Sequence, residues 1–284
     1  MTGSGWRAAI VSTIIAIAPS AIGQEMPQAG PVQSAMPQAG PVQSAMPQAG
    51  PVQTAIDGIP GSEVLNYQIE WRLIPAGSAK ITWTAVPRTG TGPNELRMHL
   101  ESTGLVSRLF HVDDDYTSAL TQNLCAQNLF IMAHEGTRNK ETRVTYDAQT
   151  RKALYLEKDL NKNVTIQHDV DIPPCVHDVL GGLVLLRTLR LEPGKTAQIP
   201  VSDGKTFVQV KVESERREEL NTPMGPRKTI RYEVFLFDNV LYKRSGHLHI
   251  WLTDDAERLP VQLQIRLQFT IGTITLKLEK EEKL

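Results

Sequence analysis

Two cysteines are the residues in this sequence whose chemistry is easiest to anticipate. Cys125 and Cys175 are its only thiols, and in an exported chain an even count predicts a disulfide. Closing a loop of about fifty residues would stabilise the fold by roughly 4 kcal/mol. Two free buried thiols or an intermolecular bond are the alternatives, because spacing alone does not bring the Cα atoms within about 7 Å. Cys175 also precedes His177 closely enough to suggest a thiol nucleophile and its base, but oxidation would remove that nucleophile.

Histidines and aspartates offer two places where a metal could bind. His247 and His249 alternate along an expected strand, so both side chains would share one face. No third ligand stands at a fixed spacing, and histidines on a solvated strand face give the same pattern. The run from Asp113 to Asp115 could hold a cation in a loop, but a calcium-loop pattern is absent, and a solvated turn or helix cap explains the run. We expect no cofactor.

Carboxylates and tryptophans raise the possibility of glycan hydrolysis, which needs two carboxyl groups flanking a sugar. Nothing in the sequence selects a pair from the candidates Glu70, Asp115 and Asp254. Stacking on a sugar ring could involve Trp71, Trp83 and Trp251. Alternation puts Trp71 on an apolar face, where core packing explains it, whereas Trp251 shares a face with the two histidines and is a possible ligand-facing residue. Phosphate-loop, nucleophile-elbow and zinc-helix motifs are absent from the sequence.

The elements that must position these residues are mostly strands. From about Asp57, apolar and polar residues alternate, which predicts half-buried antiparallel strands, about a dozen in all. The clearest run is Val261–Ile271, after which Gly272 marks a bend and the alternation resumes. Leu65–Leu73 and Ile81–Ala85 alternate in the same way and predict a hairpin that turns at Pro75–Gly77.

One segment, Val176–Leu191, has helical spacing of its apolar residues and lies between two proline-containing breakers. Gly181 and Gly182 inside it each cost about 1 kcal/mol relative to alanine, so close contact with a sheet or a ligand would be the compensating reason. The fold class that follows is α+β and mainly β. We expect a curved sheet or open barrel around, or packed against, one principal helix, with an apolar pocket in its concavity.

The N-terminal part of the chain has a different composition. Residues 1–23 carry one basic residue, an apolar run of about eleven residues and small residues near the end, which predicts a secretory signal peptide; an uncleaved anchor is the alternative. Residues 24–56 contain three copies of a decapeptide rich in proline, the first being MPQAGPVQSA. We expect a disordered linker there, with a proline-motif ligand as the alternative, and a single β-rich domain over 57–284.

Length and composition limit the function classes. The chain has 284 residues, 40% of them hydrophobic and 21% charged, which argues against wholesale disorder, a collagen-like fibre and a polytopic membrane protein. Its formal net charge of −1 argues against nucleic acid as a partner.

Four stretches together resemble a known family: YQIEWRLIPAGSAKITW, VSRLFHVDDDYTS, IPPCVHDVLGGLVLLRTLRLEPG and GHLHIWLTDDAERLPVQL. They resemble the exported bacterial domain of unknown function family 3108 (DUF3108), over about Glu63 to Leu278. The resemblance implies a β-rich periplasmic or envelope protein whose curved sheet looks like the half-barrels of lipoprotein carriers. It implies no catalytic residues.

The functional expectation combines these inferences. We expect a non-catalytic periplasmic or secreted binding or carrier module for an apolar or amphipathic ligand such as an envelope lipid, without a transmembrane span once the leader is cleaved. An envelope glycan hydrolase and a structural or assembly factor are the alternatives.

Overall fold

The computed structural model describes residue 59 and residues 61–86, 92–267 and 272–284, so the expected leader and linker lie outside the described residues. Fourteen strands form a single antiparallel sheet in the order β8-β7-β6-β5-β4-β3-β2-β1-β14-β13-β12-β11-β10-β9. The sheet is open, with β8 and β9 at its edges. The expected fold class, a curved, mainly β structure with one principal helix, is confirmed.

The strands run over β1 Ser62–Trp71, β2 Ile74–Thr84, β3 Asn94–Ser102, β4 Val112–Leu120, β5 Ala126–Glu135, β6 Arg138–Asp147, β7 Lys152–Asp159, β8 Val164–Asp171, β9 Thr196–Ser202, β10 Phe207–Thr222, β11 Gly225–Val234, β12 Gly246–Thr253, β13 Pro260–Leu267 and β14 Gly272–Lys283. The two helices are α1 Gly104–Leu109 and α2 Val179–Thr188. Neither helix is long and apolar enough to cross a membrane.

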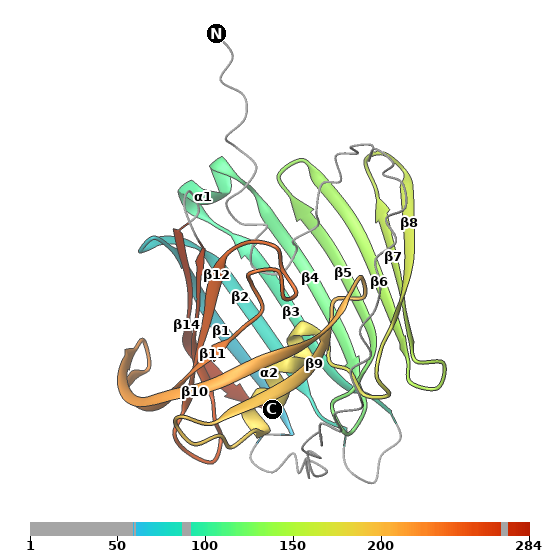
Figure 1. Cartoon of the computed structure of the whole chain (residues 1–284). Helices are drawn as coiled ribbons and strands as arrows, with labels where there is room; N and C mark the ends of the chain where they lie inside the picture. Colours follow the sequence, from blue (N-terminus) through green and yellow to red (C-terminus); the bar gives the residue numbers. More distant parts are fainter. Residues whose placement is uncertain (1–58, 60, 87–91, 268–271) are drawn as a thin grey trace, which may run out of the picture.

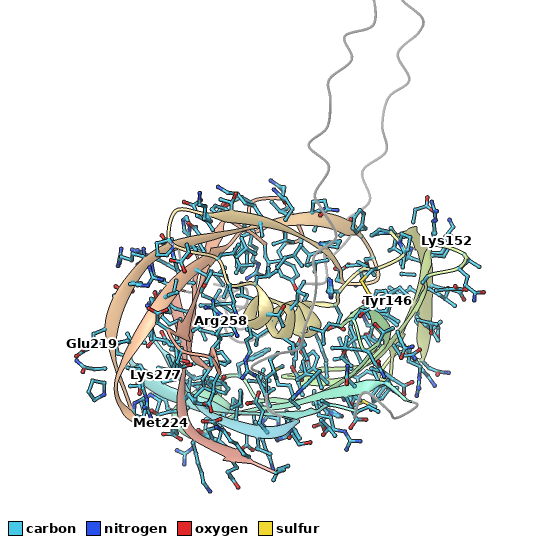
Figure 2. All side chains as sticks on the ribbon, turned by 90° about the horizontal axis from the view of Figure 1, so that it is seen from below. Tyr146, Lys152, Glu219, Met224, Arg258 and Lys277 are labelled. Carbon is cyan, nitrogen blue, oxygen red and sulfur yellow. A yellow bond between two sulfur atoms is a disulfide. The ribbon has the colours of Figure 1, made fainter. Side chains whose placement is uncertain are left out.

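The sheet wraps around α2. Figure 1 shows β9 and β10 crossing in front of this helix while β3 to β8 rise behind it, and Figure 2 shows the helix inside the ring of strands. The segment that leads into α2 reaches back to edge strand β9, where His177 forms a parallel bridge with Val201. Apolar residues of the strands' concave faces therefore pack onto the helix from most directions.

Helix α2 is apolar around most of its circumference, as expected of a buried helix. It begins after Asp178, whose side chain accepts hydrogen bonds from the backbone N–H groups of Leu180 and Gly181, both at 2.9 Å. The sequence pattern placed the start at Val176, but residues before Asp178 are drawn into the extended bridge to β9. The helix also ends at Thr188, earlier than expected.

The first hairpin differs from the expected one. Its turn is at Arg72–Leu73, and Pro75 and Gly77 lie inside β2. Pro75 is tolerated because the register with β1 shifts between Ile69 and Glu70. Gly77 is required by close packing, since a Cβ there would lie 2.1 Å from the Glu101 carbonyl oxygen. Pro75 and Gly77 are typical turn-forming residues, but in the structure they lie in a strand next to a β-bulge.

The structure also tests the expectations for the aspartate run and for the C-terminal hairpin. Asp113–Asp115 are in β4, not in a turn or cap, and alternation sends Asp114 inward while its neighbours face outward. The expected hairpin at the C-terminus is present as β13 and β14, with Gly272 opening β14 at a φ of +82°. Residues 268–271 of the expected Val261–Ile271 run lie outside the described part of the chain.

Large side chains close the core between sheet and helix. Trp83, Tyr67, Tyr116 and Tyr232 are each less than 2% exposed. Burying an aliphatic or aromatic side chain of this kind contributes about 1.5–3 kcal/mol relative to leaving it in water. Trp83 is thus a core residue, while Trp71 at the end of β1 is only partly buried.

Candidate functional site

An apolar cavity of about 110 Å³ lies between α2 and the concave face of the sheet. It is bounded by α2, β9 to β13, and the connection between β11 and β12, with contributions from β2, β3 and β14. Its walls are aliphatic and aromatic, and Tyr242 is the one lining residue with a polar side-chain atom. The lining includes Val179, Leu183, Leu186, Val210, Phe237, Leu248, Ile250 and Ile265. This is the concave pocket that the alternation of strand residues predicts.

The two glycines of α2 have different surroundings. Gly182 lines the apolar cavity, and a Cβ there would meet only Val201 Cγ2, at an ordinary 3.9 Å. A Cβ on Gly181 would lie 3.0 Å from Leu120 Cδ2 and 3.4 Å from the Asp178 carboxylate. Gly181 therefore allows close packing against β4, whereas Gly182 leaves space that a ligand can occupy.

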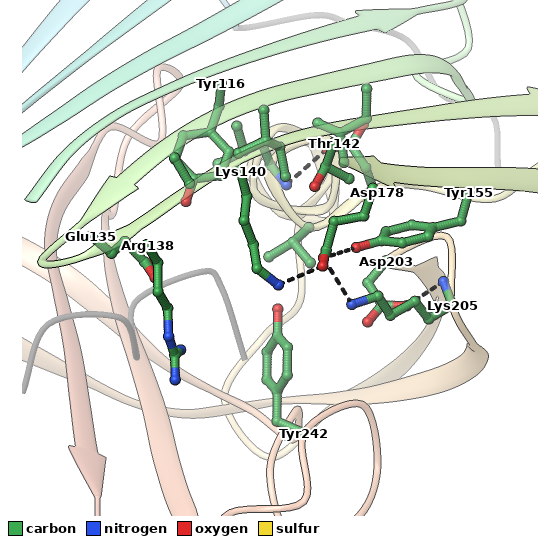
Figure 3. Close-up of a pocket in the computed structure, with 16 residues that line it drawn as sticks. Tyr116, Glu135, Arg138, Lys140, Thr142, Tyr155, Asp178, Asp203, Lys205 and Tyr242 are labelled. Carbon is green, nitrogen blue, oxygen red and sulfur yellow. Dashed lines mark hydrogen bonds and ion pairs between the residues drawn. The ribbon is translucent and has the colours of Figure 1, made fainter. Parts of the chain in front are cut away.

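A second cavity, of about 90 Å³, adjoins the first and is lined by charged and aromatic groups. At its centre is the Glu157 carboxylate of β7, with its side chain 9% exposed. Lys140 contacts one carboxylate oxygen at 2.5 Å, and Lys205 lies 3.4 Å from the other, to which the Tyr155 hydroxyl donates. Figure 3 shows these three side chains converging on one carboxylate. Burial raises the pKa of Glu157, but these bonds and charges outweigh it and hold the pKa below its ordinary value.

A buried acidic pair lies beside this charged cavity. Glu135 at the end of β5 lines it, and Asp114 on the neighbouring strand β4 is 2% exposed. Burial, together with the Glu135 charge, raises the pKa of Asp114 from 3.8 to about 7, although the His134 backbone N–H donates to Asp114 at 2.9 Å. Asp114 is therefore partly protonated near neutral pH.

The connection between β11 and β12 borders both cavities. Tyr242 from this connection lines both, as do Val179 and Leu180 of α2. The connection folds on itself, with the Leu241 and Tyr242 N–H groups donating to the Leu236 carbonyl and the Phe237 and Tyr242 rings 5.7 Å apart. In Figure 3 the Tyr242 hydroxyl points into the charged cavity from the side opposite Lys140.

The expected metal-binding histidines are outside the concavity. His247 and His249 share the convex face of β12, with rings 6.2 Å apart. Glu215, Glu233 and His249 bring one potential ligand atom each within 4.8 Å of one another. However, Glu215 already accepts two hydrogen bonds from Arg231, and Glu233 accepts one from His247 at 2.7 Å. These groups could hold a metal only if those contacts were exchanged.

Trp251 lies on the same convex face and lines neither cavity. It is nevertheless only 6% exposed, and the Glu218 side chain of β10 accepts a hydrogen bond from its Nε1 at 2.7 Å. The signal that identified Trp251, its shared face with two histidines, is correct, but the face is the outer one.

The candidate carboxylates for glycan hydrolysis are not brought to either cavity. Glu70 pairs with Lys277, Asp115 with His99, and Asp254 with Arg217. Asp115 does belong to a second exposed group, with His99 and Asp113, whose ligand atoms are within 4.8 Å of one another. Exposed acidic groups of this kind are common without a metal.

Cys125 and Cys175 form a disulfide in the structure, with Cα atoms 5.0 Å apart. It ties the turn between β4 and β5 to the segment before α2. His177 contacts the Leu124 carbonyl oxygen at 2.7 Å beside this bond, so the residue acts in packing and not as a base for a thiolate. Burial lowers the pKa of His177, which keeps the ring neutral.

The residues that the sequence analysis missed are those of the charged cavity. Lys140 lies on the same face of β6 as Thr142 and Val144, and Glu157 lies on the same face of β7 as Tyr155. The signal available was a charge at a position whose neighbours two residues away face the core. Lys205 gave no such signal, because it reaches the cavity from the turn between β9 and β10.

One solved structure supports the fold. The chain is similar to a β-barrel-like protein of the domain of unknown function DUF1849 from Brucella abortus, with 8% identity, a TM-score of 0.53, and 80% of this chain and 99% of that chain covered. It also matches a protein described as exported, with a YmcC-like fold, from Bacteroides fragilis NCTC 9343, at 9% identity and a TM-score of 0.37, covering 80% and 99% of the two chains. A protein described as a lipoprotein from Parabacteroides distasonis ATCC 8503 matches at 11% identity and a TM-score of 0.34, covering 80% and 98%.

No curated protein matches the chain. The profile of the family described as "Protein of unknown function (DUF3108)" matches residues 66–279, which include nearly the whole sheet, α2 and both cavities. The chain therefore belongs to the DUF3108 family.

Proposed function

We propose that this protein is an extracytoplasmic, non-catalytic binding or carrier module for an amphipathic ligand. The observation that carries the proposal is the pair of adjoining cavities inside the sheet, one apolar and one charged, with Tyr242 at their boundary. An amphipathic molecule has the same two-part character. Its apolar part would lie against α2, and its polar end would reach Lys140 and Lys205.

The compartment belongs to the proposal. The apolar run and small residues of 1–23 are typical of an export signal, and a disulfide such as Cys125–Cys175 persists in oxidising compartments. Both features support a location outside the cytosol.

The size of the cavities limits what can bind without rearrangement. An apolar cavity of about 150 Å³ is large enough to bind benzene. The apolar cavity here, at about 110 Å³, therefore accepts a short apolar group as it stands. A longer chain would require the connection between β11 and β12 to move away from α2, as loops over binding sites commonly do.

Thermal unfolding with and without defined amphiphiles tests the proposal. The probes are a saturated fatty acid, the alcohol of the same chain length, and a lysophospholipid. At about a hundred times Kd, a ligand stabilises by about 2.7 kcal/mol, which for a domain of this size corresponds to a rise in Tm of roughly 5–10 °C. A larger rise with the acid than with the alcohol would indicate that the lysines bind the polar end.

A cavity-filling variant provides the matched control. Gly182→Leu puts a side chain into the apolar cavity from a position where a Cβ meets no close contact. We expect this variant to remain folded and to lose the ligand-induced rise. Leu154→Phe, on an exposed part of β7, should retain it. The proposal is contradicted if no probe stabilises the protein and no amphiphile is found by mass spectrometry of organic extracts, or if Gly182→Leu responds like the unchanged protein.

A further inference from the structure

The antiparallel order of the sheet carries six described connections toward one end of the molecule. One of them, β9–β10, turns inward, where Gly204 packs against Val144 of β6 and Tyr155 of β7. The other five remain at that end. They are β1–β2, β3–β4 with α1, β5–β6, β7–β8 and β11–β12. Figure 1 shows this end, with α1 and the first residues of β8, at the top. We call it the α1 rim and define it by residues 72–74, 103–111, 136–138, 160–166 and 235–245.

Exposed large hydrophobic side chains gather at the α1 rim. The described residues include nine such side chains, and seven of them belong to the rim: Leu73, Ile74, Leu105, Leu109, Leu160, Val164 and Ile166. Single exposed apolar residues are normal on a protein surface, but their concentration at one end marks an interaction surface. Leu154 and Leu284 are the two that lie elsewhere.

The turn between β1 and β2 exposes a leucine in an unfavourable backbone conformation. Arg72 and Leu73 have φ angles of 50° and 69°, the left-handed region that a two-residue hairpin turn normally fills with Asn-Gly. Bulky side chains are disfavoured in this conformation. Leu73 is 85% exposed, so packing within the fold does not offset that cost. A role for the side chain outside the fold explains its presence.

The short helix α1 presents leucines in the same way. Val106 is buried, whereas Leu105 and Leu109 on the opposite side are 61% and 58% exposed. Because the helix follows β3 and packs beside β2, its leucines lie at the same end of the sheet as Leu73 and Ile74.

The charge of the α1 rim differs from that of the whole chain. The rim residues include six basic side chains, all exposed, namely Arg72, Arg108, Arg138, Lys162, Lys243 and Arg244, and one acidic side chain, Asp238. The chain as a whole has a net charge of −1. Apolar side chains intermixed with basic ones are the composition that binds the surface of an anionic bilayer.

We propose that the α1 rim docks on the surface of an anionic lipid bilayer, with Leu73, Leu105 and Leu109 inserted at headgroup depth and the basic residues on lipid phosphates. A bilayer is favoured over a protein partner because the leucines are divided between two connections, β1–β2 and α1, and Arg72 and Arg108 directly precede Leu73 and Leu109. A protein interface would need one shape-complementary core patch. Arg138 belongs both to the rim and to the charged cavity, so docking would bring that cavity to the lipid surface.

Vesicle co-sedimentation tests the proposal with the full-length protein. The probes are vesicles of phosphatidylethanolamine with phosphatidylglycerol, and vesicles of phosphatidylcholine alone. We expect binding to the anionic vesicles that weakens with added salt, and little binding to the neutral ones. Replacing Leu73, Leu105 and Leu109 together by serine should weaken the affinity by about tenfold or more, whereas Leu154→Ser should not change it. All variants carry the same residues 1–58, so any contribution from that segment cancels.

A second variant separates docking from folding. Replacing Arg72-Leu73 by Asn-Gly suits the turn better, so Tm should rise while vesicle binding falls. Gly182→Leu should bind vesicles normally, which distinguishes failure of this proposal from failure of the ligand-binding proposal. Unchanged binding by the triple serine variant, or equal binding to neutral vesicles, would overturn the inference. So would a stoichiometric protein partner captured through the same three leucines in place of lipid.

Discussion

Arg187 near the end of α2 and Glu63 at the start of β1 form an ion pair inside the curved sheet, with side chains 3% and 1% exposed. The guanidinium contacts both carboxylate oxygens, one of them at 3.3 Å, and also donates to the backbone carbonyls of Glu257 and Arg258. The helix is thereby fixed to β1 and to the connection before β13. Because α2 forms one wall of both cavities, this contact determines where that wall stands.

Removing one partner of this pair leaves an uncompensated buried charge. We expect Glu63→Ala to lower the free energy of unfolding by about 3–5 kcal/mol, measured by urea denaturation. Glu257→Ala breaks the exposed pair with Lys283, whose side chains are 44% and 52% exposed, and should cost less than about 1 kcal/mol. If both substitutions lowered the free energy of unfolding equally, burial would not be what makes the Arg187–Glu63 pair important.

Asp114 predicts a pH dependence of stability. Its pKa in the folded protein, about 7, exceeds the ordinary 3.8, so the folded state holds the proton more tightly than the unfolded state. The contribution of Asp114 protonation to the free energy of unfolding is fully present below about pH 4 and is lost as pH rises through about 7. It amounts to at most about 4 kcal/mol.

The substitution Asp114→Asn removes this titration while keeping an oxygen that can accept from the His134 backbone. Between about pH 4 and pH 8 the variant should therefore lose less stability than the unchanged protein, as seen in unfolding curves across that range. Parallel profiles for the protein and Asp114→Asn would show that Asp114 ionises normally.

The sequence predicted the sheet and the helix because their signals are periodic. Alternation over residues such as Val261 to Leu267 requires one face to be buried, and the apolar spacing between two breakers identified α2. The turn at Arg72–Leu73 could not be found in this way. Its residues are poor turn formers, while the better ones, Pro75 and Gly77, are used inside a strand.

The candidate site was predictable only in its apolar half. Gly182 lines the apolar cavity, where the sequence suggested contact with a sheet or a ligand. Alternation along β12, however, does not indicate which of its two faces is concave. Trp251 and His249 therefore fell on the outside. The charged cavity joins Lys140, Glu157 and Lys205 from three different elements, and such a meeting depends on sheet curvature that no local pattern encodes.

The two glycines of α2 should respond differently to alanine. Gly182→Ala gains helix propensity without a close contact, so we expect stabilisation by about 1 kcal/mol and a rise in Tm of roughly 2–4 °C. Gly181→Ala gains the same propensity but must displace the Leu120 side chain, and should stabilise less or destabilise. Calorimetry on both variants measures the difference, and equal stabilisation would show that the contact with Leu120 is not restrictive.

The disulfide should act mainly through the unfolded chain. Hydrogen bonds hold the same two segments together in the folded state, including one from the Ala126 N–H to the Val176 carbonyl at 2.7 Å. Replacing Cys125 and Cys175 together by serine should therefore preserve the folded structure while lowering stability by about 2–4 kcal/mol. The urea m-value should rise, because an unfolded chain freed from a loop across 50 residues exposes more surface. Adding reductant to the unchanged protein should reproduce both shifts, since it opens the same loop without altering any other side chain. Lower stability with an unchanged m-value would instead place the effect in the packing around His177, and no change with reductant would mean that the two thiols are not bonded in the isolated protein.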